Sequence, residues 1–146
     1  QFIYTDELLL ARILNNLLTN AINYSPLGSP IHIQALSDSQ NHFKINVIDA
    51  GDGVPIEMQA KIFERFTRGN QESTVTGLGL GLALSRELVK SLGGTLSVTN
   101  VVPHGACFTI ELPQPSQIEQ RQFASQLHNQ SHISINSPSD YENLPT

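Results

Sequence analysis

Two glycine-rich segments hold the residues with the clearest potential for chemistry. They read Asp49-Ala-Gly-Asp-Gly53 and Gly77-Leu-Gly-Leu-Gly-Leu82. Glycine adopts backbone angles closed to other residues and carries no side chain, so a ligand can approach the main chain closely. The second segment runs directly into an amphipathic helix pattern, so its amide groups can open that helix toward a phosphate. Together the two segments predict a nucleotide site.

Three asparagines lie on one side of a helix predicted upstream of the glycine segments. Asn16, Asn20 and Asn23 are spaced i, i+4 and i+7, so they share a face. An amide offers a neutral oxygen to a hard cation and N–H groups to phosphate oxygens. Magnesium takes few protein ligands, so one asparagine plus a nucleotide suits it. For any single asparagine here, a solvated polar face is the alternative.

Asp49 ends a predicted strand in which Phe43, Ile45 and Val47 alternate with polar residues. A carboxylate buried there needs a hydrogen-bonding partner. An adenine amino group is one such partner, and a turn amide is the other. Asp52 fits ordinary turn chemistry.

Apolar periodicity predicts the elements that position these residues. A helix with Thr5 or Asp6 as N-cap ends before Pro26, and its apolar face is Leu10, Ile13, Leu14, Leu17, Leu18 and Ala21. The predicted strands are a strand end at 2–4, a hairpin around 31–35 and 43–47, and two strands at 95–100 and 106–112. A short helix is predicted at 55–63, a polar loop at 67–76 and a helix at 80–92, in which Leu84, Leu88 and Leu92 are aligned. This order predicts an α/β two-layer sandwich, a mixed sheet covered on one face by about three helices.

Composition limits the classes of protein. A chain of 146 residues with 39% hydrophobic content suits one domain, expected at 1–113, and the polar segment 114–146 reads as a flexible tail or linker. The net charge of −5 gives nucleic-acid binding little support. Cys107 is the one cysteine, so it fits a reducing compartment, and we expect it buried in a strand. With no apolar run of about 18 residues, we expect a soluble, cytoplasmic domain without membrane insertion, whose parent can still be membrane-anchored.

Four motifs resemble those of sensor histidine kinases, in the same order and spacing, over about residues 2 to 113. Asn16-Leu-Leu-Thr-Asn20-Ala-Ile-Asn-Tyr24-Ser-Pro26 resembles their N box, and Asp49–Gly53 their first glycine box. Ile62-Phe63-Glu64-Arg65-Phe66 resembles the F box, and Gly77–Leu82 the second glycine box. The resemblance implies the Bergerat (GHKL) ATP-binding fold, with ATP and Mg²⁺ as cofactors and a flexible lid between the last two motifs.

The resemblance also implies residue roles. Asn20 becomes the Mg²⁺ ligand and Asn16 a contact to phosphate or to a Mg²⁺-bound water. Asp49 accepts a hydrogen bond from the adenine amino group, with Gly51 and Gly53 giving the purine room. The full cofactor-binding set implied is Asn16, Asn20, Asn23, Tyr24, Asp49, Gly51, Gly53, Gly77, Leu78, Gly79, Leu80 and Gly81.

Other implied roles concern the lid and the phosphates. Gly77, Gly79 and Gly81 would present backbone N–H groups to the phosphates. Arg65 and Arg68 would neutralise charge on the γ-phosphate, a solvated surface role being the alternative. The F-box aromatics Phe63 and Phe66 would anchor the base of the lid, or act as ordinary core residues.

Two positions depart from the family pattern. Asn23 stands where Lys or Arg is common, which weakens phosphate neutralisation or shifts it to Arg65, Arg68 or Lys61. Leu78 stands where Ser or Thr is common. Since the backbone is expected to bind there, we expect little effect.

Asn16 indicates which type of reaction to expect. Relatives that hydrolyse ATP or phosphorylate serine place a Glu base at this position, and an amide cannot act as a base. A neutral imidazole needs none, so Asn16 favours phosphoryl transfer to histidine. None of the five histidines is followed by Glu or Asp, as the family's acceptor usually is.

We therefore expect the acceptor on a separate dimerisation domain of the kinase, a response regulator as indirect partner, and a monomeric isolated domain. A regulatory module that binds nucleotide without transferring phosphate is the alternative, favoured by Asn23. A purely structural interaction domain would leave both glycine boxes unexplained.

Overall fold

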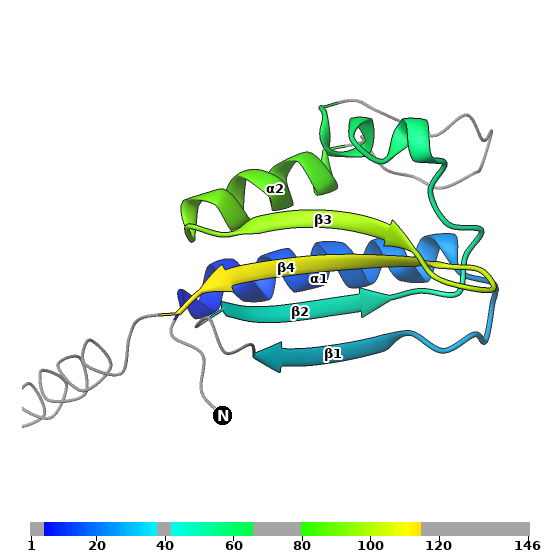
Figure 1. Cartoon of the computed structure of the whole chain (residues 1–146), viewed down its shortest axis with the longest axis horizontal. Helices are drawn as coiled ribbons and strands as arrows, with labels where there is room; N and C mark the ends of the chain where they lie inside the picture. The colour runs from blue at the N-terminus through cyan, green and yellow to red at the C-terminus, as the bar shows by residue number, and fades with distance from the viewer. Residues whose placement is uncertain (1–4, 38–41, 66–79, 115–146) are drawn as a thin grey trace, which may run out of the picture. The chain divides into compact units, whose positions relative to one another are not determined.

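A computed structural model of the chain describes residues 5–37, 42–65 and 80–114 (Figure 1). The elements in order are helix α1 (Glu7–Tyr24), strands β1 (His32–Ser37) and β2 (His42–Ile48), the 3₁₀ turns η1 (Ile56–Met58) and η2 (Lys61–Phe63), helix α2 (Gly81–Ser91), and strands β3 (Thr95–Asn100) and β4 (Ala106–Pro113). The strand end predicted at 2–4, the polar loop at 67–76 and the tail from 115 onward lie outside the described residues.

The described strands form one sheet in the order β1-β2-β4-β3. The predicted β1–β2 hairpin is confirmed, with Ile33 opposite Val47 and Ala35 opposite Ile45. Every pairing among the described strands is antiparallel, so the parallel pairing that a mixed sheet requires is not among them. The helices cover one face, and the predicted two-layer α/β class is confirmed.

Helix α1 begins and ends where local chemistry predicts. The Asp6 carboxylate accepts a hydrogen bond from the Leu9 N–H at 3.0 Å, which satisfies one of the unpaired amides of the first turn. The helix ends at Tyr24, and Ser25 leaves the helical conformation just before Pro26. Residues next to the helix therefore set both of its ends.

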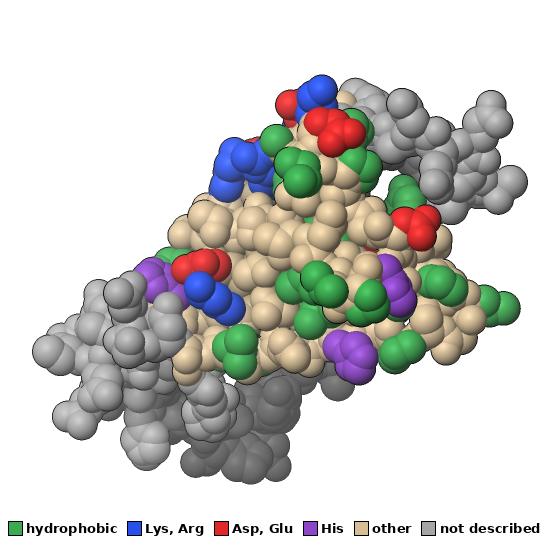
Figure 2. Space-filling model, turned by 45° about the vertical axis from the view of Figure 1, so that its right-hand side comes forward, with side chains coloured by type: hydrophobic (Ala, Val, Ile, Leu, Met, Phe, Trp, Pro, Cys, Tyr) green, Lys and Arg blue, Asp and Glu red, His purple; other side chains and the backbone are tan. Residues whose placement is uncertain are grey.

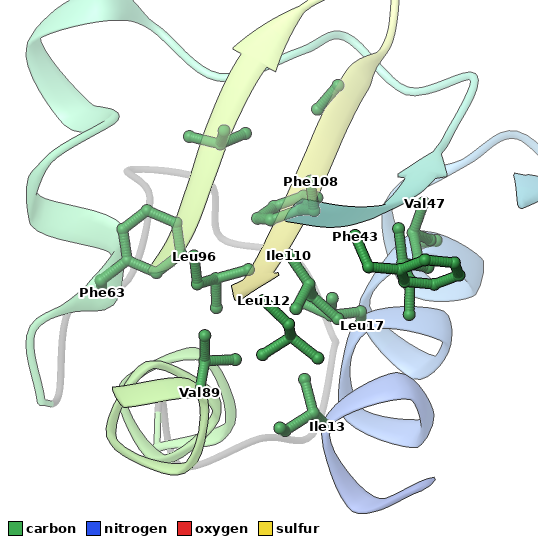
Figure 3. Packing of buried hydrophobic residues seen from close by; sticks show 14 residues of the cluster. Ile13, Leu17, Phe43, Val47, Phe63, Val89, Leu96, Phe108, Ile110 and Leu112 are labelled. Atoms are coloured by element: carbon green, nitrogen blue, oxygen red, sulfur yellow. The ribbon is translucent and has the colours of Figure 1, made fainter. Parts of the chain in front are cut away.

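The hydrophobic core lies between the two helices and the sheet (Figure 3). Helix α1 contributes Ile13, Leu17 and Ala21, all at most 1% exposed, as its predicted apolar face requires. Helix α2 contributes Val89 from the other side (Figure 3). The strands supply the remaining large buried side chains: Phe43, Ile45, Val47, Leu96, Val98, Phe108, Ile110 and Leu112. Both helices are thereby fixed over one face of the sheet.

Two predicted details differ in the structure. The helix expected at 55–63 forms the two short 3₁₀ turns η1 and η2, because so short a segment nucleates an α-helix poorly. In α2 the buried stripe runs through Ser85 and Val89, so Leu84 is turned about 100° away from Ser85 and is 37% exposed. A polar residue thus occupies the centre of the helix face that meets the core.

Charged side chains form small mixed groups on the face shown in Figure 2. Lysines and arginines lie beside acidic side chains there, and Lys44 pairs with Glu111 at 3.4 Å. No large patch of a single charge covers the part of this face that the structure describes. Within the described ranges, no helix is both long and apolar enough to cross a bilayer.

Candidate functional site

Asp49 lies directly after β2, in the loop that carries the first glycine segment. Its side chain is 7% exposed, and its Oδ1 accepts hydrogen bonds from the N–H groups of Gly51 at 2.9 Å and Ala106 at 3.0 Å. Its own N–H donates to the Ala106 carbonyl oxygen at 2.9 Å, which extends the β2–β4 ladder by one residue. The turn amide considered as an alternative partner is therefore present, on one carboxylate oxygen.

The other carboxylate oxygen of Asp49 is available to a ligand. Among the described residues, Oδ2 accepts no hydrogen bond. In that same part of the chain, every fully buried side-chain oxygen or nitrogen has a partner, so Oδ2 must reach the solvent. A largely buried carboxylate with one open oxygen is a fixed acceptor for a ligand N–H donor.

The glycines of this loop are required by the packing of the chain itself. A Cβ at Gly51 would lie 2.6 Å from the Tyr24 carbonyl oxygen. Gly53 has φ +81°, and a Cβ there would lie 2.9 Å from Asn100 Oδ1. Gly105 has φ +114°, and a Cβ there would collide with the Asp49 carbonyl oxygen. The Asp49 loop is therefore enclosed between the end of α1 and the β3–β4 turn.

Two side chains that sequence reasoning missed hold this loop in place. Ser25 Oγ accepts a hydrogen bond from the Ala50 N–H at 3.2 Å. Asn100 Oδ1 accepts from the Val54 N–H at 2.8 Å, and its Nδ2 donates to the Val54 carbonyl oxygen at 2.9 Å. Asn100 thus pairs with Val54 as a neighbouring strand would. Its position at a strand end gave no signal of a partner 46 residues away.

The asparagines of α1 differ in their environments. The partly buried Asn16 donates from Nδ2 to Ser85 Oγ at 3.2 Å and to the Gly81 carbonyl oxygen at 3.5 Å. Asn20 is partly buried and its side chain makes no hydrogen bond to a described residue, whereas Asn23 is exposed. Tyr24, at the C-terminal end, is 55% exposed. Asn20 therefore lies on α1 between Asn16, which contacts α2, and Tyr24, the helix end beside the Asp49 loop.

Helix α2 begins without a side-chain cap. Leu80 occupies the N-cap position and makes no capping hydrogen bond, so no side chain serves the amides of the first turn in this way. A Cβ at Gly81 would meet no atom within 4 Å, so the packing of the described chain does not require a glycine there. The start of α2 thus has both open space beside Gly81 and first-turn amides without a side-chain cap. Gly77, Leu78, Gly79 and Arg68 lie outside the described residues.

The described part of the F box contributes one buried aromatic side chain and one exposed cation. Phe63 is 7% exposed and packs edge-on against Phe108, with ring centroids 6.4 Å apart. The Arg86 guanidinium lies 5.6 Å from the centre of the Phe63 ring. Arg65 is exposed, and Phe66 lies outside the described residues. The core role considered for Phe63 is confirmed.

The side chains of α1 that face the candidate site offer amide oxygens to a metal. Within the described ranges, no cluster of three or more His, Cys, Asp or Glu side chains could hold a metal ion. The side-chain oxygen of Asn20 on α1 fits Mg²⁺, which is bound by few protein ligands together with water and substrate phosphates, and the Asn16 amide fits a contact to a phosphate or to a Mg²⁺-bound water.

The fold defines the class of protein: a two-layer α/β domain whose candidate site lies among α1, the loop after β2 and the start of α2. The family model described as histidine kinase-, DNA gyrase B-, and HSP90-like ATPase matches residues 5–116. The chain belongs to this family.

The relatives within this family are sensor histidine kinases. The chain is 41% identical over 121 residues to the sensor protein KdpD of Escherichia coli K12, covering 83% of this chain and 13% of that protein. It is 35% identical over 111 residues to the adaptive-response sensory kinase SasA of Rippkaea orientalis, covering 76% and 28%. The chain thus spans less than a third of the length of these relatives.

Solved structures show the same fold. The mycobacterial sensor histidine kinase MprB matches with a TM-score of 0.72 and 30% identity, covering 79% of this chain and 78% of that one. Full-length ShkA in complex with AMPPNP matches with a TM-score of 0.68 and 32% identity, covering 78% and 23%. The resemblance to histidine kinase catalytic domains is thereby confirmed.

Proposed function

We propose that this chain binds Mg-ATP between the Asp49 loop and the start of α2 and transfers the γ-phosphate to a histidine on a separate dimerisation domain. The carboxylate of Asp49 carries the proposal: one oxygen is held by two backbone amides and the other is open. An acceptor fixed in this way selects a ligand with an N–H donor, and the amino group of adenine supplies one. The backbone carbonyl of Tyr24 lies beside Gly51, so Tyr24 is a candidate neighbour of the bound purine.

The phosphates lie, in this proposal, toward α2. The first-turn amides of α2 and the backbone of Gly77, Gly79 and Gly81 donate to phosphate oxygens. Asn20 holds Mg²⁺, which neutralises phosphate charge when it is bound. Arg65 and Arg68 are the candidates that stabilise the charge developing on the transferred group.

The proposed acceptor is an imidazole because the site offers no base on α1. Asn16 is an amide, and its Nδ2 is already engaged with Ser85 and Gly81. A serine or water nucleophile would need a base to remove its proton, whereas a neutral imidazole has a free lone pair. The acceptor domain feeds a response regulator in this scheme, and the parent kinase works in the cytoplasm, with or without a membrane anchor.

One observation favours a second function, a nucleotide-binding regulatory module. Asn23 is exposed and neutral where the family commonly has a cation. If Arg65 and Arg68 do not replace that charge, the domain binds nucleotide without transferring phosphate.

A transfer assay separates the two functions. The chain is mixed with Mg-ATP labelled at the γ-position and with the dimerisation domain of its own kinase. We expect acid-labile phosphohistidine on that domain. Tight ATP binding without phosphohistidine would establish the regulatory module instead.

The metal assignment has its own test. Asn20→Ala should abolish Mg²⁺-dependent ATP binding measured by calorimetry. Asn15→Ala, an exposed neighbour on the same helix, is the matched control and should bind as the wild type does. An unchanged affinity for Asn20→Ala would remove Asn20 as the ligand.

A further inference from the structure

A buried serine of α2 links the two helices beside the proposed phosphate site. Ser85 is 0% exposed, and its Oγ donates to the Gly81 carbonyl oxygen at 2.8 Å. The same Oγ accepts a hydrogen bond from Asn16 Nδ2 at 3.2 Å, and Asn16 Nδ2 also lies 3.5 Å from the Gly81 oxygen. Asn16, Ser85 and Gly81 therefore form a closed hydrogen-bonded triangle.

This triangle determines which end of the Asn16 amide faces α2. A serine hydroxyl has one hydrogen, and here it is given to the Gly81 carbonyl oxygen. Both atoms that face the amide thus present lone pairs, so only the NH₂ end can satisfy them. The reversed amide would set Oδ1 against the Gly81 oxygen, and a buried polar group without its partner costs about 1–3 kcal/mol.

We propose that Ser85 is a positioning residue that fixes the polarity of the Asn16 amide, with the NH₂ toward α2 and Oδ1 away from it. This inference rests on the proposed binding of Mg-ATP. An outward Oδ1 accepts a hydrogen bond from a metal-bound water and repels phosphate oxygens. The sequence left Asn16 open to either a phosphate or a Mg²⁺-bound water, and the triangle selects the water.

The same triangle also holds the start of α2, through the Gly81 carbonyl oxygen. It belongs to the first residue of that helix, whose amides are proposed to face the phosphates. The three hydrogen bonds thereby fix the start of α2 against α1. In this proposal, one partly buried contact therefore holds both Asn16, on the metal side of the site, and the start of α2, on its phosphate side.

The test compares ATP affinity with Mg²⁺ and with EDTA, by calorimetry on the full chain. Ser85→Ala leaves Asn16 Nδ2 only the longer contact to Gly81, so the amide is free to turn. We expect ATP affinity to fall about tenfold with Mg²⁺ and to stay unchanged with EDTA. A tenfold fall is the lower end of the range for losing a side chain that orients a group next to a metal. A residue that only stabilises α2 would lower both affinities alike, and that result would overturn the proposal.

Ser91→Ala is the matched control. Ser91 lies on the same helix and its Oγ donates to the Leu88 carbonyl oxygen at 2.7 Å, but it is exposed and this hydrogen bond stays within α2. The ATP affinities of Ser91→Ala with Mg²⁺ and with EDTA should both equal those of the wild type. Ser85→Thr keeps the hydroxyl and should keep the metal dependence, which covers the case in which Ser85→Ala does not fold.

A double-mutant cycle assigns the effect to Asn16. In an Asn16→Ala background, Ser85→Ala should not change the ratio of the two affinities, because the amide it orients is gone. A further fall in the ratio of affinity with Mg²⁺ to affinity with EDTA in that background would overturn the proposal. A wild-type chain that binds no ATP would instead refute the proposed function, so the two failures are distinct.

Discussion

At the scale of single residues, Asp49 shows how a buried carboxylate can be both structural and available to a ligand. Burial in a strand end would be unfavourable for an isolated charge. The N–H groups of Gly51 and Ala106 compensate for it at one oxygen, and they also lock the side-chain orientation. The second oxygen therefore points in one fixed direction, which is what selective recognition of a purine edge requires.

Asp49→Asn separates these two roles. The asparagine Oδ1 can keep the hydrogen bonds to Gly51 and Ala106, but an NH₂ group replaces the open oxygen and opposes the adenine amino donor. We expect ATP affinity, measured by calorimetry, to fall roughly ten- to hundredfold, as a charged hydrogen bond is worth about 1.5–3 kcal/mol. The exposed Asp52, changed to Asn, is the matched control and should bind normally. Equal affinity of the Asp49 variant would contradict the adenine assignment.

At the scale of elements, local signals predicted most of the fold. The Asp6 cap, the proline after α1 and the alternation of β1 and β2 all act within a few residues, so their reading from sequence was correct. The sequence also predicted Asp49 and the asparagine face of α1 as candidate site residues. Their assignment to a ligand site stays a prediction.

The missed features depend on contacts between distant segments. Ser85 pairs with Asn16 across 69 residues, and Asn100 pairs with Val54 across 46. Neither residue stands out in a local pattern, because its partner is set by how the helices and the β3–β4 turn pack. The exposure of Leu84 has the same origin: helical spacing aligned three leucines, but the packing of α2 placed Ser85 against α1 instead.

The start of α2 gives a prediction at this scale. A Cβ at Gly81 meets open space, so Gly81→Ala should preserve the free energy of unfolding or raise it by up to about 1 kcal/mol. ATP affinity should nevertheless fall at least about tenfold, as for one lost charge-assisted hydrogen bond, because the methyl group would obstruct the phosphates. Denaturant unfolding and calorimetry measure the two quantities.

A second glycine provides the contrast. A Cβ at Gly94 would collide with the Glu111 carbonyl oxygen and Leu112, so Gly94→Ala should lose stability. If Gly81→Ala behaves like Gly94→Ala and destabilises the fold, Gly81 serves packing and not a ligand.

At the scale of the whole molecule, the site and the core share their elements. Helix α1 carries Asn16 and Asn20 directly beside the stripe on which it buries Ile13 and Leu17. The Asp49 loop continues a central strand of the sheet. A ligand that joins α1, this loop and α2 therefore binds only the folded chain, and its binding must raise global stability.

Thermal unfolding should reveal this linkage. Mg-ATP at 100 times its Kd adds about 2.7 kcal/mol of stability, which for a domain of this size raises Tm by on the order of 10 °C. Leu17→Ala, at a side chain that is 0% exposed, should lower Tm through a loss of about 2–5 kcal/mol yet keep the ligand-induced rise. Asp49→Asn should do the reverse, keeping Tm without ligand and losing most of the rise. If both variants lose the rise together, binding depends on overall stability alone, and the separate role assigned to Asp49 is wrong.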